Sequence, residues 1–167
     1  MAFTDKDTQR LIAQLHRDEG SKRDGDGNHV AYLDTVGVLT IGYGHNCKSS
    51  PVPGVFKPGD TITDEQANNV FERDLAAHIW EVRRKLPWVE NLDTARQAVL
   101  YNMAFNLGVS GLLGFKNTLA LIQNGDYFNA AKNMMRSLWA SQVGDGPGGK
   151  YDRAERLAKQ METGEWQ

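Results

Sequence analysis

Residues 16–20 read HRDEG and residues 31–45 read AYLDTVGVLTIGYGH, and these two stretches decide the fold that the sequence predicts. The first stretch closes a helical pattern with a glycine, which favours the backbone conformation found just after a helix end. In the second stretch, apolar residues alternate with threonine and glycine along residues 39–44, which is typical of a short strand. With Gly37 in the turn region, residues 30–43 are predicted to form a β-hairpin or small sheet.

A helix is predicted over residues 5–19, ending at the first of these glycines. Thr4 and Asp7 stand in the positions of a capping box at its start. The apolar stripe of this helix consists of Leu11, Ile12 and Leu15. Glu19 follows the last of these residues by four positions, so its carboxyl group falls on the same apolar stripe.

The rest of the chain is predicted to be mostly helical, so the expected fold class is α+β with helix predominating. A T-x-x-Q capping box opens a long helix over about residues 63–86. Residues 93–107 are apolar on most sides, as in a central buried helix, and Gly108 ends them. Residues 111–115 are expected to form a tight connection. Further helices are predicted over residues 117–124, 126–141 and 151–161.

The composition restricts the classes of protein to consider. The chain of 167 residues suits one domain, or one domain with two lobes. Its net charge of −2 gives no global attraction for nucleic acid. Cys47 is the single cysteine, so no intrachain disulfide is expected. No apolar run approaches the roughly 18 residues of a membrane span, and residues 1–16 lack the pattern of a signal peptide. If the protein acts outside the cytoplasm, another route must release it.

Glu19 and Asp34 together suggest acid–base chemistry on a glycosidic bond. On an apolar stripe the Glu19 carboxyl loses hydration and favours its protonated form, which a general acid requires. Asp34 lies in a polar turn, where a carboxylate stays ionised. Two carboxyl groups held in opposite states are the pattern of glycoside hydrolysis. Thr40 would offer a hydroxyl to a water or a sugar oxygen, and Gly42 would let a ligand approach the backbone.

Simpler interpretations stay open on spacing alone. A glutamate near a helix end is commonly solvated, Asp34 can act only as a turn cap, and the glycines can serve only strand geometry. The D-x-D-x-N pattern of residues 24–28 resembles a calcium loop but lacks its glycine and its final glutamate, so no metal site is predicted. His45 is interpreted as a structural or paired histidine, because no second His or Cys lies at ligand spacing.

The order D-E-G, then Y-L-D-T-x-G-x-L-T-I-G-Y-G-H, resembles the bacteriophage lysozymes, the muramidases of glycoside hydrolase family 24. The segment ITDEQANNVFERDLAAH is similar to the inter-lobe helix of that family. The segment ARQAVLYNMAFNLGVSGLLGFKNTLALIQNGDY is similar to its buried helix and the following connection. SLWA and YDRAERLAKQMETGEW resemble its C-terminal helices, so the resemblance covers essentially the whole chain.

This resemblance implies a phage-lysozyme-like fold with a cleft between two lobes. A small β-containing N-terminal lobe would span residues 20–62, and an inter-lobe helix would span residues 63–86. A larger helical lobe would comprise residues 87–167 together with the helix of residues 5–19. The resemblance also implies the substrate, bacterial peptidoglycan, and the bond that is cleaved, from N-acetylmuramic acid to N-acetylglucosamine.

By matched position, the family assigns the general acid to Glu19 and the second carboxylate to Asp34. Thr40 would lie beside the attacked carbon or its water, on the opposite face. The supporting residues would be His45 and Asp74, as a structural ion pair, and Arg153, near Glu19. The residues that correspond to the lining of the cleft are Phe105, Asn106, Thr118 and Asn133.

Two departures from the family pattern affect these assignments. Residues 21–29 look like an insertion that lengthens the gap between the two carboxylates and the rim of the cleft, which leaves Asp24 and Asp26 as weak rivals for the second acid. Residues 143–149 enlarge the loop before the last helix, and Leu138 stands where a basic residue is expected. A local basic face is still expected from Lys132, Arg136, Lys150, Arg153, Arg156 and Lys159.

The residues and the resemblance together predict a phage endolysin with muramidase activity, a monomer that acts on peptidoglycan without cofactor or metal. It would collect in the host cytoplasm and reach the periplasm and cell wall once a holin breaches the membrane. No nucleic-acid partner and no stable membrane association are expected. One alternative is a lytic transglycosylase, which can work with Glu19 alone and leaves anhydro-sugar ends. The other is a peptidoglycan-binding protein without catalysis.

Overall fold

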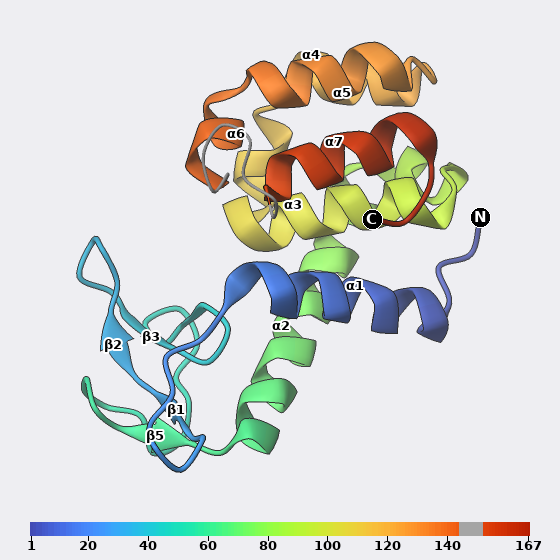
Figure 1. Cartoon of the computed structure of the whole chain (residues 1–167). Helices are drawn as coiled ribbons and strands as arrows, with labels where there is room; N and C mark the ends of the chain where they lie inside the picture. Colours follow the sequence, from blue (N-terminus) through green and yellow to red (C-terminus); the bar gives the residue numbers. More distant parts are fainter. Residues whose placement is uncertain (144–151) are drawn as a thin grey trace. The chain divides into compact units, whose positions relative to one another are not determined.

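The computed structural model describes residues 1–143 and 152–167, which form a mostly helical chain with small antiparallel sheets (Figure 1). The helices are α1 (Asp5–Glu19), α2 (Asp64–Lys85), the 3₁₀ helix η1 (Pro87–Asn91), α3 (Thr94–Leu113), α4 (Lys116–Gln123), α5 (Tyr127–Arg136), α6 (Leu138–Val143) and α7 (Arg153–Thr163). The strands are β1 (His29–Val30), β2 (Tyr32–Leu33), β3 (Leu39–Ile41), β4 (His45–Asn46) and β5 (Thr61–Ile62). The predicted α+β class is confirmed.

The chain divides into two compact units. One comprises residues 1–11 and 78–167, and the other comprises residues 12–77. The boundary between them runs through α1 and through α2. The first unit is called the helical unit below, and the second is called the β-containing unit.

Both predicted capping boxes are present. At the start of α1, the Thr4 N–H donates to Asp7 Oδ2 at 3.0 Å, and the Asp7 N–H donates to Thr4 Oγ1 at 3.3 Å. At the start of α2, the Thr63 N–H donates to Gln66 Oε1 at 2.9 Å, and the Gln66 N–H donates to Thr63 Oγ1 at 3.1 Å. Each box satisfies backbone donors that have no partner inside the helix, which fixes where the helix begins.

The β-containing unit holds two small antiparallel sheets. Strands β2, β3 and β4 form one sheet in that order, and β1 pairs with β5 in the other. Thr40 lies opposite Tyr32 on one side and opposite Asn46 on the other. The strand alternation predicted through residue 43 stops at Ile41, because Gly42 takes a φ of +62° and turns the chain.

Apolar side chains of the sheets, the loops and α2 form the core of the β-containing unit. Its buried members include Leu15, Ala31, Ile41, Tyr43, Cys47, Val52, Val55, Ile62, Ala67, Phe71 and Leu75. Cys47 is a free thiol in this core, and burial raises its pKa. A thiol held protonated in this way is a poor nucleophile, so Cys47 is a packing residue.

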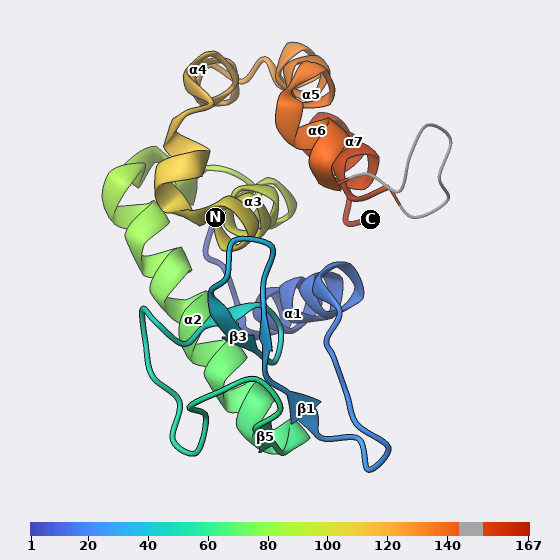
Figure 2. The same cartoon turned by 90° about the vertical axis from the view of Figure 1, so that its left-hand side faces the viewer.

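The helical unit is built around α3, and Figure 2 shows α4 to α7 following it along the chain. The segment predicted as a buried helix lies almost entirely out of solvent from Gln97 to Ala104. Gly108, with φ 75° and ψ 158°, interrupts the helix where the sequence predicts its end. Helix then resumes as far as Leu113, so the tight connection predicted over residues 111–115 is wrong. The connection is confined to Gly114 and Phe115.

The single helix predicted over residues 126–141 is also wrong, because the chain breaks at Ser137 into α5 and α6. Ser137 has an extended ψ of 156°, and its hydroxyl accepts the Ala140 N–H at 3.3 Å. Serine is among the best residues for this capping role, and its hydroxyl also donates to the Met134 carbonyl at 2.6 Å, a local bond that competes with helix continuation. The helix predicted from residue 151 begins at Arg153 instead, where the Asp152 side chain caps it. Tyr151 lies outside the described residues.

Within residues 1–143 and 152–167, none of the individual helices has the length and apolar character that a membrane crossing requires. Taken as a pair, α3 and α4 are long and apolar enough by length and composition alone, but the chain bends by 103° between them.

Candidate active site

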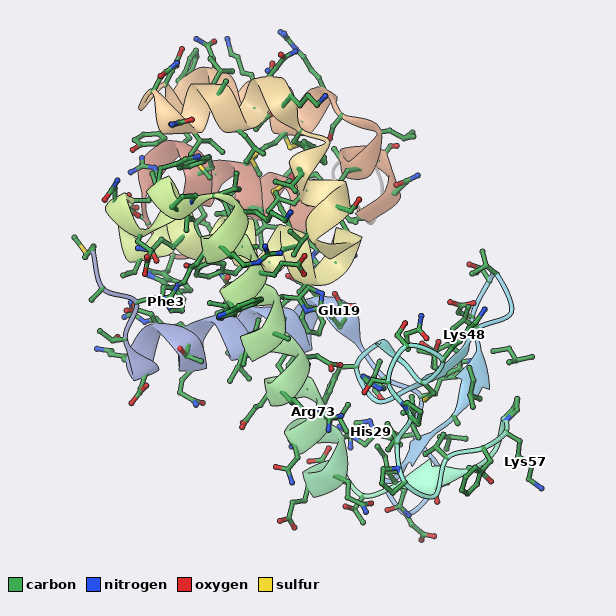
Figure 3. The ribbon with its side chains drawn as sticks, turned by 180° about the vertical axis from the view of Figure 1, so that it is seen from behind. Phe3, Glu19, His29, Lys48, Lys57 and Arg73 are labelled. Carbon is green, nitrogen blue, oxygen red and sulfur yellow. The ribbon has the colours of Figure 1, made fainter. Side chains whose placement is uncertain are left out.

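Glu19 is the last residue of α1, where Figure 3 labels it, and its side chain is half-buried. Its carboxylate lies against the backbone of Gly44: a Cβ placed on residue 44 would be 3.6 Å from Glu19 Oε2. Gly44 takes a φ of +82°, a backbone angle that residues other than glycine rarely adopt. The turn at Gly44 therefore accounts for the glycine.

Asp34 lies in the turn between β2 and β3, and that turn fixes its orientation. Oδ1 accepts the N–H of Val36 at 3.0 Å and the N–H of Val38 at 2.8 Å. The Gly37 N–H donates to the Asp34 carbonyl at 3.0 Å, which closes the turn. Both of these hydrogen bonds converge on Oδ1, so that, among the residues the structure describes, Oδ2 is left for another donor.

Thr40 is buried in the middle of β3, and the backbone of Val38 joins it to Asp34. The Thr40 hydroxyl donates to the Val38 carbonyl at 3.0 Å, while the Val38 N–H donates to Asp34 Oδ1. Since the hydroxyl hydrogen is used in this way, the lone pairs of Thr40 Oγ1 are left to accept from a donor such as water. The structure thus joins two of the three predicted catalytic residues through the backbone N–H and carbonyl of one residue, Val38.

Tyr32 belongs to this site although the sequence analysis did not single it out. Burial, and then the negative charges of Asp34 and Glu19, raise the pKa of its phenol. Both carboxylates therefore lie within electrostatic reach of the Tyr32 ring. The ammonium of Lys22 lies 4.4 Å from the centre of that ring. The signal that could have identified Tyr32 is its register, because it lies directly opposite Thr40.

Asp24 and Asp26, the rivals for the second acid, lie in a surface turn of the insertion. Asp24 Oδ1 accepts the N–H of Asp26 and the N–H of Asn28, each at 2.9 Å. The hydrogen bond from Asn28 is the main cause that lowers the pKa of Asp24. These contacts explain the D-x-D-x-N pattern as an Asx turn. In the part of the chain that the structure describes, no group of three or more His, Cys, Asp or Glu side chains is arranged to hold a metal.

Gly42 is buried, and a Cβ on it would lie 3.5 Å from Ala67 Cβ in α2. The positive φ of Gly42 accounts for the glycine, because the distance to Ala67 is an ordinary van der Waals contact. Contact of Gly42 with substrate stays a prediction.

His45 and Asp74 form the predicted ion pair, with 2.5 Å between Nδ1 and Oδ2. The other ring nitrogen, Nε2, lies 2.7 Å from the carbonyl oxygen of Ser50. Both nitrogens thus face acceptors, an arrangement that only the protonated ring satisfies fully. The hydrogen bond to Asp74 accordingly raises the pKa of His45. This pair fastens β4 to α2.

The helical unit holds the remaining predicted residues. The Phe105 and His78 ring centroids are 5.4 Å apart, and Asn106 Oδ1 accepts the Trp139 Nε1–H at 3.0 Å. Arg153 is buried, and its Nη2 donates to the side-chain oxygen of Asn102 at 2.7 Å. The support of Glu19 by Arg153 stays a prediction.

Thr118 and Asn133 line the same open pocket, whose volume is about 510 Å³. They come from α4 and α5, so the structure joins two residues that are distant in sequence. The other lining residues are Gly114, Phe115, Lys116, Asn117 and Ser137. Ser137 was missed as a lining residue because the sequence places it inside a continuous helix.

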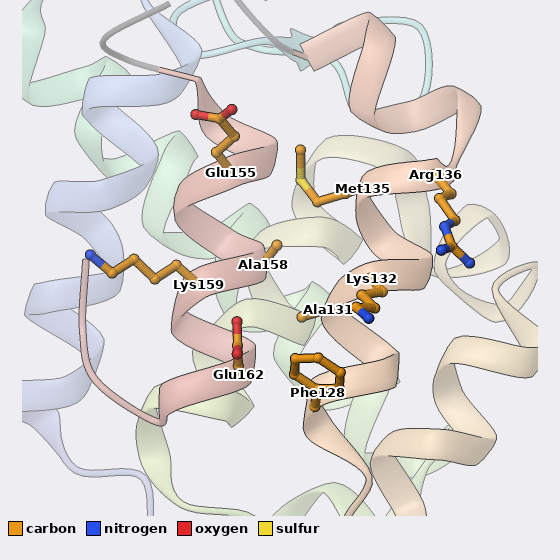
Figure 4. A pocket seen from close by; sticks show the side chains of 9 residues that line it. All are labelled: Phe128, Ala131, Lys132, Met135, Arg136, Glu155, Ala158, Lys159 and Glu162. Carbon is orange, nitrogen blue, oxygen red and sulfur yellow. The ribbon is translucent and has the colours of Figure 1, made fainter. Parts of the chain in front are cut away.

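A second pocket of about 450 Å³ lies between α5 and α7 (Figure 4). Its lining residues are Phe128, Ala131, Lys132, Met135, Arg136, Glu155, Ala158, Lys159 and Glu162. Three of the residues expected to form a basic face line it, but two glutamates accompany them, so the pocket has mixed charge. Arg153 is buried and so does not contribute to the expected basic face, and Lys150 lies outside the described residues.

Comparison with known proteins identifies the family to which the chain belongs. The family model described as phage lysozyme matches residues 24–156. The pre-baseplate central spike protein Gp5 of Enterobacteria phage T4 is 32% identical over 158 residues, which cover 83% of this chain but only 26% of that protein. Probable T4-type lysozyme 1 of Dictyostelium discoideum is 31% identical over 169 residues, 90% of this chain and 92% of that protein. The SAR-endolysin of Bacteriophage PS119 is 29% identical over 110 residues, 65% of this chain and 60% of that protein. By the extent of these matches, the chain belongs to the phage lysozyme family.

Proposed function

We propose that this protein hydrolyses the β-1,4 bond between N-acetylmuramic acid and N-acetylglucosamine in bacterial peptidoglycan. Membership of the phage lysozyme family indicates the general class, a lysozyme-like glycosidase. The observation that carries the specific proposal is the arrangement around Tyr32. Two carboxylates lie within electrostatic reach of one phenol, and one of them is joined to Thr40 through Val38.

In this mechanism Glu19 is the general acid. Its proton passes to the glycosidic oxygen as the bond to the sugar carbon breaks, so that the leaving sugar departs as a neutral alcohol. Gly44 has no side chain, so its backbone leaves room for the leaving oxygen beside Glu19 Oε2.

Asp34 and Thr40 act on the second reactant, water. Asp34 Oδ2 and the lone pairs of Thr40 Oγ1 are two acceptors, and a water has two hydrogens to donate to them. Held in this way, the water oxygen attacks the sugar carbon and its proton passes to Asp34. The negative charge of Asp34 also stabilises the positive charge that develops on the sugar.

We also propose the biological role of an endolysin that acts as a monomer and causes lysis of the host cell. The similarity to a phage SAR-endolysin supports this role. The protein would collect in the host cytoplasm and reach the wall after a holin opens the membrane.

Mass spectrometry of the fragments released from purified peptidoglycan tests the proposal. Hydrolysis is expected to give reducing N-acetylmuramic acid ends, because water completes the reaction. Anhydro ends would instead identify a lytic transglycosylase, in which a sugar hydroxyl takes the place of water. If no fragments appear while the protein sediments with the polymer, the chain only binds peptidoglycan and the proposal is wrong.

Replacing Gly44 with alanine is expected to lower both stability and the rate of hydrolysis. The positive φ makes alanine unfavourable by about 1–2 kcal/mol, and the new Cβ would lie in van der Waals contact with Glu19 Oε2 at 3.6 Å, in the space proposed for the leaving oxygen. Gly54→Ala is a matched control, since Gly54 also has a φ of +82° but a Cβ there would meet no atom within 4 Å. Thermal unfolding should show similar losses for both variants. An equal loss of hydrolysis in the control would contradict the role of Gly44 beside Glu19.

A further inference from the structure

A hydrogen-bonded network links the insertion of residues 21–29 to the N-terminus of α2. His29 is fully buried, with Nδ1 2.5 Å from Ser21 Oγ and Nε2 2.8 Å from Asp64 Oδ1. Arg23 Nη1 lies 2.9 Å from the same Asp64 oxygen, and Arg23 Nη2 donates to the Tyr43 hydroxyl at 3.1 Å. Two chains of contacts therefore start at Asp64, one ending at Ser21 and the other at Tyr43.

Both ends of this network are close in sequence to Glu19 or to the backbone that its carboxylate faces. Ser21 follows Glu19 by two residues, just after the end of α1. Tyr43 immediately precedes Gly44, whose backbone lies against Glu19 Oε2. A displacement of either end would move the carboxylate or the surface that faces it.

Backbone contacts hold the residues of the network in place. Asp64 is the first residue of α2, which the capping box of Thr63 fixes in place. His29 is held through its backbone as well, because it pairs with Ile62 of β5 and bridges to Arg23. Tyr43 also stacks on the ring of His16 at a centroid distance of 4.2 Å and an interplanar angle of 13°.

We propose that Asp64, His29 and Arg23 form a positioning network that holds the end of α1 and the backbone of Gly44 around Glu19. This inference rests on the proposed function, in which Glu19 is the general acid. The insertion that contains His29 and Arg23 is thereby assigned a role in the reaction. In this role the segment supports the general acid Glu19, in addition to the lengthening of the cleft rim that the sequence predicts.

Ser21, His29 and Asp64 are hydrogen-bonded in the same order as the residues of a serine–histidine–aspartate catalytic triad. The contacts of Arg23, however, favour a role in positioning Glu19 over nucleophilic catalysis by Ser21. Arg23 shares Asp64 Oδ1 with His29, so a guanidinium already neutralises the charge that would stabilise an imidazolium during nucleophilic catalysis. With the ring hydrogen on Nε2 donating to Asp64, Nδ1 accepts the Ser21 hydroxyl. Every member of the chain is then satisfied without a change of charge.

Two variants break the network at different points. His29→Gln can keep a donor toward Asp64 but loses the acceptor for Ser21. Arg23→Ala removes the contact with Tyr43, and the Arg23 side chain is 40% exposed, so this variant is expected to fold. Each is expected to lower kcat by about 10-fold or more, because small displacements of a catalytic group are costly. KM should change less than about 2-fold, because neither residue contacts substrate in the proposed mechanism. Lys48→Ala, which removes an exposed cation of the same unit, is the matched control.

A second measurement does not depend on activity. The titration midpoint of the Glu19 carboxyl, followed by carbon-13 NMR, is expected to move in both network variants and to stay in place in Lys48→Ala, because the surroundings of the carboxyl change only when the network breaks. If the midpoint moves in the network variants but the wild-type protein releases no fragments, the proposed function is wrong and the network stands. An unmoved midpoint, with kcat unchanged in an active protein, would refute the network alone. An unmoved midpoint in an inactive wild type would refute both.

Discussion

Glu19→Gln is expected to lower the release of reducing ends from peptidoglycan by roughly 10³-fold, the scale of a lost general acid. Glutamine has nearly the same shape as glutamate and still fits against Gly44, but its amide cannot supply the proton that the leaving oxygen requires. Binding to the polymer should persist, because the shape and packing of the end of α1 are retained. Rates measured on purified peptidoglycan, together with sedimentation of the protein with the polymer, check both expectations.

Glu72→Gln is the control for the change in charge, since Glu72 is exposed on α2 of the same unit. Its rate should match that of the wild type. If Glu19→Gln retained most of the activity while thermal unfolding showed an intact fold, the general acid would have to be another residue. The arrangement around Tyr32 would then lose its interpretation as a catalytic site.

Asp74→Asn is expected to destabilise the β-containing unit by roughly 2–3 kcal/mol at pH 5, because it leaves the buried His45 cation without its carboxylate. The pKa of His45 is raised in the folded protein by the hydrogen bond to Asp74. Its contribution is therefore complete below the unfolded value of about 6.5 and is lost as the pH rises through the folded pKa. The difference in unfolding free energy between wild type and variant should accordingly shrink toward pH 9.

Urea denaturation of both proteins at pH 5, 7 and 9 measures this difference. Glu65→Gln, at the exposed start of the same helix, should give a small difference that is constant over this range. An equally large loss at pH 5 and pH 9 from Asp74→Asn would mean that the pair does not depend on a charged imidazole.

The sequence predicted best those features that depend on neighbouring residues. The boundaries of α1 were predicted without error, because Thr4 and Gly20 determine them locally. The break at Ser137 was missed because a serine inside an amphipathic pattern is compatible with helix, and only the contact with Ala140 reveals a cap. In the same way, Glu19 could be placed on an apolar stripe by counting residues, but its contact with Gly44 could not.

In the site, too, contacts between residues distant in sequence could not be predicted from the residues alone. His45 and Asp74 are 29 residues apart, and their pairing was expected only through the family resemblance. Tyr32 and the network of His29 were not expected, since contacts between residues far apart in the chain depend on the tertiary fold. The contact between His29 and Asp64 spans 35 residues and begins in the segment of residues 21–29, which was expected only to lengthen the rim of the cleft.

The backbone N–H and carbonyl of Val38 link Asp34 to Thr40 without using the Val38 side chain, and this has a consequence for how tolerant the position is to mutation. Any residue with an N–H and a carbonyl preserves the link, so a saturation library at position 38 should retain hydrolysis with side chains of many sizes. Proline is the exception, because it has no N–H to donate to Asp34. In a mutational scan, position 38 would thus tolerate every substitution except proline, although its backbone links two residues of the site.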